Sequence, residues 1–193
     1  MKRIALFGGS FNPPHVSHRA IASALSKHFD EVIILPCGGR PDKLSVSAIA
    51  AAHRFAMIQM TFGGLPRIRI ELFDLENEVY TISYDLDQMF RSEGQVWHAV
   101  GSDLIEGGKD GNSLIQREWV QGKELWENCN IVVLQRPGFE CEVGDLPPHR
   151  MVLQLNQDGA SSAIKAQLQG GHSIDNLVMP QVAQYIKEHG LYR

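Results

Sequence analysis

The chain has 193 residues, enough for one well-packed domain, and its apolar content of 44% and charged content of 21% are ordinary for a globular protein. The formal net charge of −4 argues against a nucleic-acid partner, and three cysteines without C-x-x-C spacing argue against a disulfide scaffold or a cysteine-based zinc site. No apolar run approaches the ~20 residues that cross a bilayer, so we expect a soluble cytoplasmic protein with no membrane partner.

Strand-like and helix-like segments alternate along the chain, which predicts an α/β fold. We expect a single doubly wound, Rossmann-like, mostly parallel sheet with helices on both faces. A first strand is predicted at 2–7, a helix at 17–28, a buried strand at 31–35 and a helix at 47–60. Ser47 is the expected N-cap of that second helix. The apolar stripe predicted for it consists of Ile49, Ala52, Ala56 and Met60.

The second half of the chain continues the alternation. Further strands are predicted at 67–72, 95–100, 131–134 and 151–155, and helices after Thr81, at 161–169 and at 180–189. Residues 107–112 are glycine-rich and predict a loop. We therefore expect one domain over 1–193, with a small helical part at about 156–193.

The loop after the first strand combines two glycines, two prolines and two histidines. Gly8 and Gly9 lie at the carboxyl end of the strand, where open parallel sheets bind ligands and where missing side chains let the backbone approach an anion. A helix N-terminus follows, with its positive dipole end. His15 and His18, three residues apart, can stabilise charge on a phosphoryl group. The pattern predicts a phosphate site; metal ligation by the histidines and a purely structural loop are the alternatives.

The run GSFNPPHVSH at 9–18 resembles the G-[ST]-F-[DN]-P-x-H-x-G-H signature of the nucleotidylyltransferase superfamily. Members of this superfamily join a nucleoside triphosphate to a phosphate-bearing acceptor. The run departs from the signature at Ser17, where the superfamily usually has glycine. A small polar residue fits there and tightens the loop.

Segments further along the chain are similar to the bacterial nicotinate-nucleotide (nicotinate mononucleotide) adenylyltransferases. They are LPCGGRPDK at 35–43, Tyr80-Thr81, Gly101-Ser102-Asp103, Trp119, IVVLQRPG at 131–138 and the run at 180–192. The resemblance assigns acceptor binding to Asn12, Lys43, Tyr80, Thr81 and Trp119. It assigns ATP binding to Gly8, Gly9, Ser10, Phe11, His18, Gly101, Asp103, Arg136, Ser161, Ser162 and Lys165, and catalysis to His15, His18 and Lys165.

A second phosphate site is implied by SSAIK at 161–165, which resembles the family's I-S-S-T-x-I-R motif at a helix start. Ser161 or Ser162 is expected to cap this helix, and its N–H groups with Lys165 to grip the β- and γ-phosphates of ATP. Ala163 replaces Thr, and Lys165 replaces Arg, which removes the two-pronged match to phosphate oxygens. An ordinary capped helix is the alternative. Arg54 and Glu71 are interpreted as surface or helix-face charges.

The resemblance implies that ATP and nicotinate mononucleotide are the small-molecule substrates and that nicotinate adenine dinucleotide and pyrophosphate are the products. Mg²⁺ is expected on the triphosphate, held by substrate oxygens and water, with no metal site on the protein. Two alternatives stay open: the same chemistry on nicotinamide mononucleotide or another phosphorylated acceptor such as phosphopantetheine, and a non-catalytic nucleotide-binding relative. The non-catalytic relative is favoured by the departures from the family motifs at Ser17, Ala163 and Lys165. The oligomeric state also stays open, a homo-oligomer included.

Overall fold

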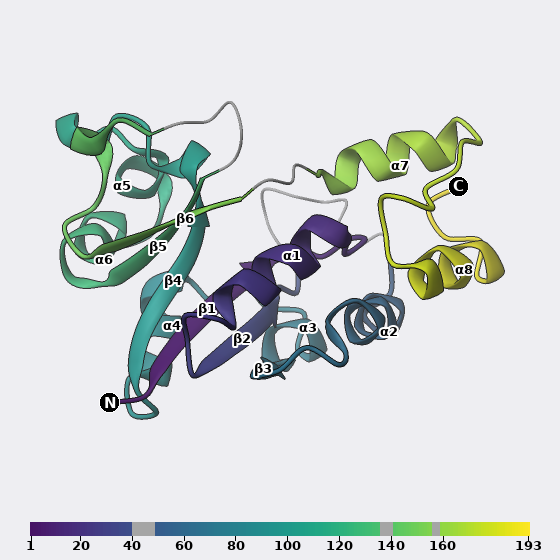
Figure 1. Cartoon of the computed structure of the whole chain (residues 1–193), viewed down its shortest axis with the longest axis horizontal. Helices are drawn as coiled ribbons and strands as arrows, with labels where there is room; N and C mark the ends of the chain where they lie inside the picture. Colours follow the sequence, from purple (N-terminus) through teal and green to yellow (C-terminus); the bar gives the residue numbers. More distant parts are fainter. Residues whose placement is uncertain (40–48, 136–140, 156–158) are drawn as a thin grey trace.

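The computed structural model describes residues 1–39, 49–135, 141–155 and 159–193. Within these ranges, six strands form one all-parallel sheet in the order β3-β2-β1-β4-β5-β6 (Figure 1). The strands are β1 (Arg3–Gly9), β2 (Glu31–Pro36), β3 (Ile68–Ile70), β4 (Gln95–Gly101), β5 (Asn130–Gln135) and β6 (Arg150–Gln154). The predicted parallel sheet is therefore confirmed, with a third strand that is shorter than expected.

Helices join and flank these strands. The α-helices are α1 (Val16–Leu25), α2 (Ala51–Phe62), α3 (Phe73–Glu76), α4 (Ser83–Phe90), α5 (Leu114–Glu118), α6 (Gly122–Asn128), α7 (Ser161–Gln169) and α8 (Pro180–Glu188). Short 3₁₀ turns are η2 (Ser102–Leu104), η3 (Gly108–Asp110) and η4 (Val143–Asp145). The helices α3, α5 and α6 were not predicted from the sequence, because they are too short to show a helical period. The segment that contains η3 was predicted as a loop.

Alternate residues of the strands pack on opposite faces of the sheet, as the pleat requires. Ala5 and Phe7 of β1 join the core under α1 and α2, whereas Ile4 and Leu6 join the core under α4. In the same way, β5 directs Val132 and Leu134 to the α1 face and Ile131 and Val133 to the helices α5 and α6. Helices thus cover both faces, and the doubly wound architecture is confirmed.

The apolar stripe predicted for α2 is only partly correct: Ile49 and Met60 pack partly against the core that includes residues of α7 and α8, but they are not the residues that α2 buries most. Ala52 is exposed, and the residues that the helix buries are Arg54, Met57, Ile58, Thr61 and Phe62. These positions follow a helical spacing, but the first of them is the charged Arg54. A prediction from apolar residues alone therefore does not identify this face of α2. Ser47 lies outside the described residues, and the observed N-cap is Ala50.

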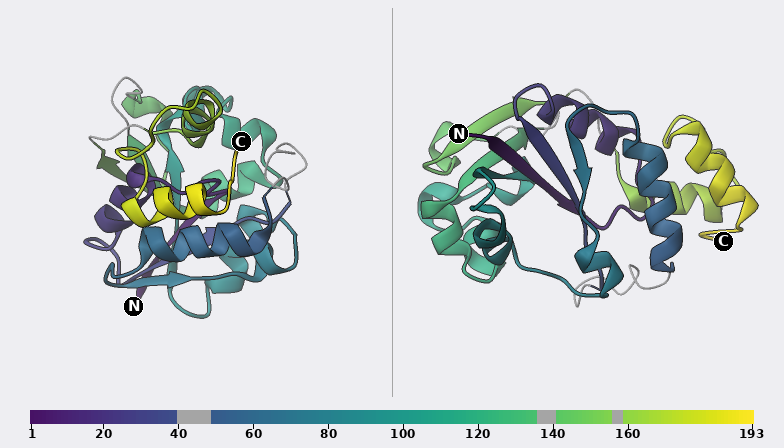
Figure 2. Two further views of the ribbon diagram at one scale, coloured as in Figure 1. Left: turned by 90° about the vertical axis from the view of Figure 1, so that its right-hand side faces the viewer. Right: turned by 90° about the horizontal axis from the view of Figure 1, so that it is seen from below.

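The C-terminal helix α8 lies beside α2, and both α7 and α8 lie beyond the end of the sheet rather than over it (Figure 1 and Figure 2). Met57 of α2 packs into a core with Ile164 of α7 and with Val182 and Ile186 of α8. The hydroxyl of Tyr185 lies 2.9 Å from Nδ1 of His53, which adds a polar contact between α8 and α2. This packing carries the start of α7 towards the loop that follows β1.

Candidate active site

The order of the sheet reverses between β1 and β4, so the connections leave in opposite directions and the carboxyl ends of these two strands open a crevice. A cavity of about 260 Å³ lies there. Seven of the residues singled out from the sequence line it, namely Gly8, Gly9, His18, Tyr80, Thr81, Gly101 and Trp119. The fold thus brings the predicted phosphate loop and most of the predicted acceptor residues to one cavity.

The two signature histidines stack on each other at the start of α1. Their ring centroids are 3.6 Å apart and the ring planes meet at 25°. His15 is the N-cap of the helix, and its backbone N–H donates to Nδ1 of His18 at 3.2 Å. Because Nδ1 of His18 accepts this hydrogen bond, the proton of a neutral His18 ring sits on Nε2. His18 therefore lines the cavity as a ring whose tautomer is set by the backbone.

The start of α1 offers fewer backbone donors to an anion than the sequence suggested. The N–H of His15 is used by His18, and the N–H of Val16 donates to the carbonyl of Leu177 at 3.0 Å. Two N–H groups of the helix start thus already have protein acceptors. The charge-stabilising role predicted for this loop consequently depends more on the His18 ring and on Gly8 and Gly9 than on the helix terminus.

Phe11 and Asn12 hold the signature loop in place from inside the protein. Phe11 is only 1% exposed, and its ring meets those of Phe7, Phe62 and His18 edge-on, the last at a centroid distance of 4.9 Å. Asn12 is 2% exposed, and its Oδ1 accepts a hydrogen bond of 2.6 Å from the hydroxyl of Tyr192. Both side chains were assigned to substrates from the sequence, but in this structure they contact protein.

Arg54 lies against the signature loop, and its interpretation as a surface or helix-face charge is wrong. It is 2% exposed. Its Nε and Nη2 donate to the carbonyl of Ser10 at 3.1 and 2.6 Å, and Nη2 also donates to the carbonyl of Cys37 at 2.6 Å. Burial lowers the pKa of the guanidinium. Arg54 therefore ties the signature loop to the end of β2.

The wall of the cavity that carries Tyr80 and Thr81, two residues predicted to bind the acceptor, is built by the segment between α3 and α4. The carboxylate of Asp74 accepts from the backbone N–H of Thr81 at 2.9 Å and from its hydroxyl at 2.6 Å. The N–H of Gly38 donates to the carbonyl of Val79 at 2.8 Å, and a Cβ at Gly38 would lie 2.4 Å from that same oxygen. Only glycine permits this approach, so it fixes the segment that presents Tyr80 and Thr81.

Trp119 and Gly101 meet the cavity from the β4 side. Gly101 ends β4, and Trp119 ends α5 and packs partly against the core of α5 and α6. Asp103 is exposed in the first turn of η2, next to Gly101, and is not among the described residues that line the cavity. Its predicted contact with ATP stays a prediction.

The predicted second phosphate site lies across α1 from the cavity. A separate cavity of about 300 Å³ lies between the start of α1, with His15 and Ser17, and the start of α7, with Ala160 and Ala163. A Cβ at Gly159 would lie 2.5 Å from the hydroxyl oxygen of Ser17. Ser17, where the superfamily has glycine, is thus accommodated by a glycine on the facing segment.

The cap of α7 differs from the prediction. Ala160 is the N-cap and supplies no side-chain oxygen, whereas the hydroxyl of Ser161 donates to the carbonyl of Pro13 at 2.9 Å. Ser161 thus anchors α7 to the signature loop instead of capping it. Ser162 is exposed, and Lys165 is half-buried and lines neither cavity among the described residues. Lys43 and Arg136, also predicted to bind substrates, lie outside the described residues.

Comparisons with known proteins agree with this geometry. The cytidylyltransferase-like family model matches residues 6–168. A probable nicotinate-nucleotide adenylyltransferase of Neisseria meningitidis is 32% identical over 100% of this chain and 99% of its own length, and one of Pseudomonas aeruginosa is 30% identical over 100% and 98%. The chain belongs to the cytidylyltransferase-like family, among the nicotinate-nucleotide adenylyltransferases. The family predicted from the sequence is confirmed.

The fold of this adenylyltransferase is shared with solved structures. Nicotinic acid mononucleotide adenylyltransferase of Plasmodium falciparum, complexed with NaAD, superposes with a TM-score of 0.80, at 22% identity and over 100% of this chain and 98% of that chain. At this identity the match supports the fold. In the described part of this family member, no helix is both long and apolar enough to cross a membrane.

Proposed function

We propose that this chain transfers the adenylyl group of ATP to nicotinate mononucleotide, giving nicotinate adenine dinucleotide and pyrophosphate. The proposal is carried by one observation: Gly8, Gly9 and His18 line the same cavity as Tyr80 and Trp119. The first three suit phosphate oxygens, and an aromatic pair suits a pyridine ring. The full-length relatives carry the same activity in their names.

In the mechanism that we infer, an oxygen of the acceptor's 5′-phosphate attacks the α-phosphorus of ATP in line. A new P–O bond forms, and the bond to the leaving pyrophosphate breaks. The attacking phosphate is already anionic, so no general base and no covalent enzyme intermediate are needed. The chain then acts by positioning the two phosphates and by stabilising charge in the transition state.

His18 has the central role in this mechanism. Its Nε2–H donates to an oxygen of the reacting phosphate, and the backbone N–H of His15 holds the tautomer that makes this possible. His15 lies between the main cavity and the one at the start of α7. Lys165 and the start of α7 are assigned to the leaving pyrophosphate. The role of the α7 start is supported by the second cavity, whereas the role of Lys165, which lines neither cavity among the described residues, follows the resemblance alone.

Mg²⁺ fits this site as an ion that arrives on the triphosphate. Among the described residues that line the cavity, Asp74 is the one carboxylate, and both of its oxygens accept from Thr81. The walls therefore offer no set of oxygen ligands of the kind that Mg²⁺ takes from proteins. When bound, the ion would neutralise charge on the β- and γ-phosphates.

The test is pyrophosphate release by purified protein with ATP and, in turn, nicotinate mononucleotide, nicotinamide mononucleotide and phosphopantetheine. We expect turnover with the first that exceeds the others. Equal rates with the amide would refute the acid preference, and ATP binding without turnover would favour a non-catalytic relative.

His18→Ala should lower kcat by roughly 10²–10³-fold while ATP still binds, because it removes a donor to the transition state. His28→Ala is the matched control, since His28 is exposed beyond the other end of α1. Full activity of His18→Ala would contradict the role given to this ring.

A further inference from the structure

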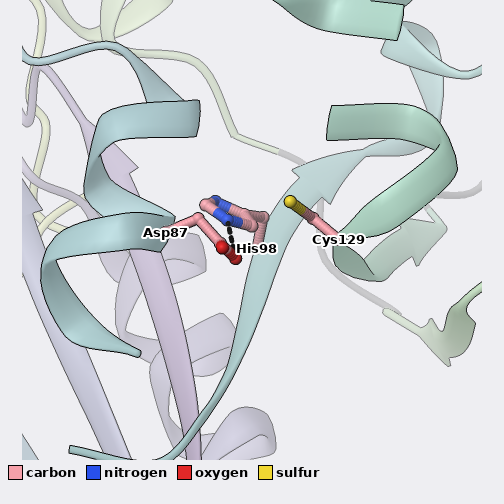
Figure 3. A group of neighbouring side chains, drawn as sticks. All are labelled: Asp87, His98 and Cys129. Atoms are coloured by element: carbon pink, nitrogen blue, oxygen red, sulfur yellow. Dashed lines mark hydrogen bonds and ion pairs between the residues drawn. The ribbon is translucent and has the colours of Figure 1, made fainter. Parts of the chain in front are cut away.

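Three side chains with metal-binding chemistry meet inside the protein, away from the phosphate loop. Asp87 of α4, His98 of β4 and Cys129 at the end of α6 are 3%, 4% and 2% exposed. Figure 3 shows them pointing towards one another from three different elements. One ligand atom from each lies within 4.8 Å of the other two, and Nε2 of His98 is 3.2 Å from Oδ1 of Asp87.

We propose that Asp87, His98 and Cys129 bind one transition-metal ion of the Zn²⁺ class. A carboxylate oxygen, an imidazole nitrogen and a thiolate sulfur are the donor types that such ions take from proteins. With metal–ligand bonds of about 2.0–2.3 Å, tetrahedral ligands stand roughly 3.3–3.8 Å apart. The ligand atoms, which lie up to 4.8 Å apart, would therefore have to approach one another by about 1 Å, and rotation about side-chain bonds can provide this movement.

The carboxylate of this group already has a cationic partner, Arg91. Asp87 uses its other oxygen, Oδ2, to accept from Nε of Arg91, so Oδ1 is the oxygen directed at His98. A thiolate and a carboxylate together neutralise a doubly charged ion, and Arg91 holds the carboxylate from outside. This is the arrangement of ligands and supporting hydrogen bonds that fixes metal sites elsewhere.

Binding would be coupled to loss of a proton. Burial, reinforced by the carboxylate of Asp87, raises the pKa of the Cys129 thiol to about 11, so the thiol is neutral near pH 7. Formation of the metal–sulfur bond breaks the S–H bond, and the proton passes to the buffer. No oxidant or reductant is involved.

The site touches the substrate cavity through one residue. His98 lines that cavity together with Gly101 and Trp119. The fourth position of a tetrahedral ion is therefore left for water from the cavity side. A bound ion would link α4 to the end of α6 and fix the His98 ring, but the proposal does not depend on the adenylyl transfer.

The test uses the full chain, stripped of metal with a chelator, without nucleotide, and titrated with Co²⁺ alone. We expect one equivalent to bind, with a thiolate-to-cobalt charge-transfer band and the visible bands of tetrahedral Co²⁺. Zn²⁺ should displace the Co²⁺, as the usual affinity order requires. Saturation with Zn²⁺ at about 100 times its Kd should raise Tm by roughly 5–10 °C.

Cys129→Ser should abolish the charge-transfer band and weaken Co²⁺ binding by at least about 100-fold. Cys141→Ser is the matched control, because Cys141 is a half-buried cysteine outside this group, and it should bind as the wild type does. Absence of the band in the wild type, or its survival in Cys129→Ser, would overturn the proposal. Asp87→Asn gives a second readout if Cys129→Ser does not fold.

Discussion

Replacing Arg54 with Met tests how the signature loop is held. The substitution keeps an unbranched side chain of similar length but removes every donor. Two backbone carbonyls, of Ser10 and Cys37, then lose their charged partner in a buried place. The loop after β1 and the end of β2 would no longer share an anchor.

The expected magnitude follows from these contacts. A hydrogen bond to a charged donor contributes about 1.5–3 kcal/mol, so the two carbonyls lose roughly 3–6 kcal/mol. Part of this is returned, because burying the guanidinium is itself unfavourable, as its lowered pKa indicates. We expect a net loss of about 2–4 kcal/mol in the free energy of unfolding, which leaves most proteins folded. A loop displaced by about 1 Å should cost roughly 10²-fold in kcat.

The assay pairs urea unfolding with pyrophosphate release. Arg67→Met is the control, since exposed Arg67 also donates to two backbone carbonyls, those of Ser26 and Phe29, far from the cavity. The control should change kcat little and unfolding by less than about 1 kcal/mol. If Arg54→Met keeps kcat within about threefold of wild type, the anchoring role is refuted.

Three further outcomes follow from the site. Tyr192→Phe should lower the free energy of unfolding by about 0.5–1.5 kcal/mol and should also lower kcat, because the Tyr192 hydroxyl holds the signature loop. Tyr185→Phe is its control: it loses one hydrogen bond to α2 and should lower stability but not kcat in the same urea and rate assays. Ala160→Ser should raise Tm, because a hydroxyl at this N-cap of extended backbone contributes about 0.5–1 kcal/mol; an unchanged or lower Tm in calorimetry would contradict it. Asp74→Asn should raise KM for the acceptor more than KM for ATP, because it loosens Thr81.

The sheet and its phosphate loop were predictable because they rest on local patterns. Apolar runs bounded by glycine and proline mark β1, β2, β4 and β5, and their alternation with helix-like segments predicts a doubly wound parallel sheet. The loop itself is one continuous run, so its residue types can be read together. Tyr80 and Thr81, in contrast, were singled out through the resemblance to the family.

Residues whose role depends on distant partners could not be predicted. Arg54 looks like a helix charge until α2 is placed against the loop, 44 residues away along the chain. Asp87, His98 and Cys129 have no spacing that suggests a group, because three separate elements bring them together. The N-cap predicted for α7 was wrong by one residue. Ala160 is the N-cap, and the hydroxyl of Ser161 donates to the carbonyl of Pro13 instead.

The contact between Gly38 and Val79 bears on what a substitution at position 80 can change. The segment that carries Tyr80 is pinned to β2 through main-chain atoms, and the carbonyl of Asp74 also accepts from the N–H of Val79 at 3.0 Å. Main-chain bonds survive most side-chain substitutions. A substitution at position 80 should therefore change the side chain that lines the cavity and leave the shape of this wall as it is.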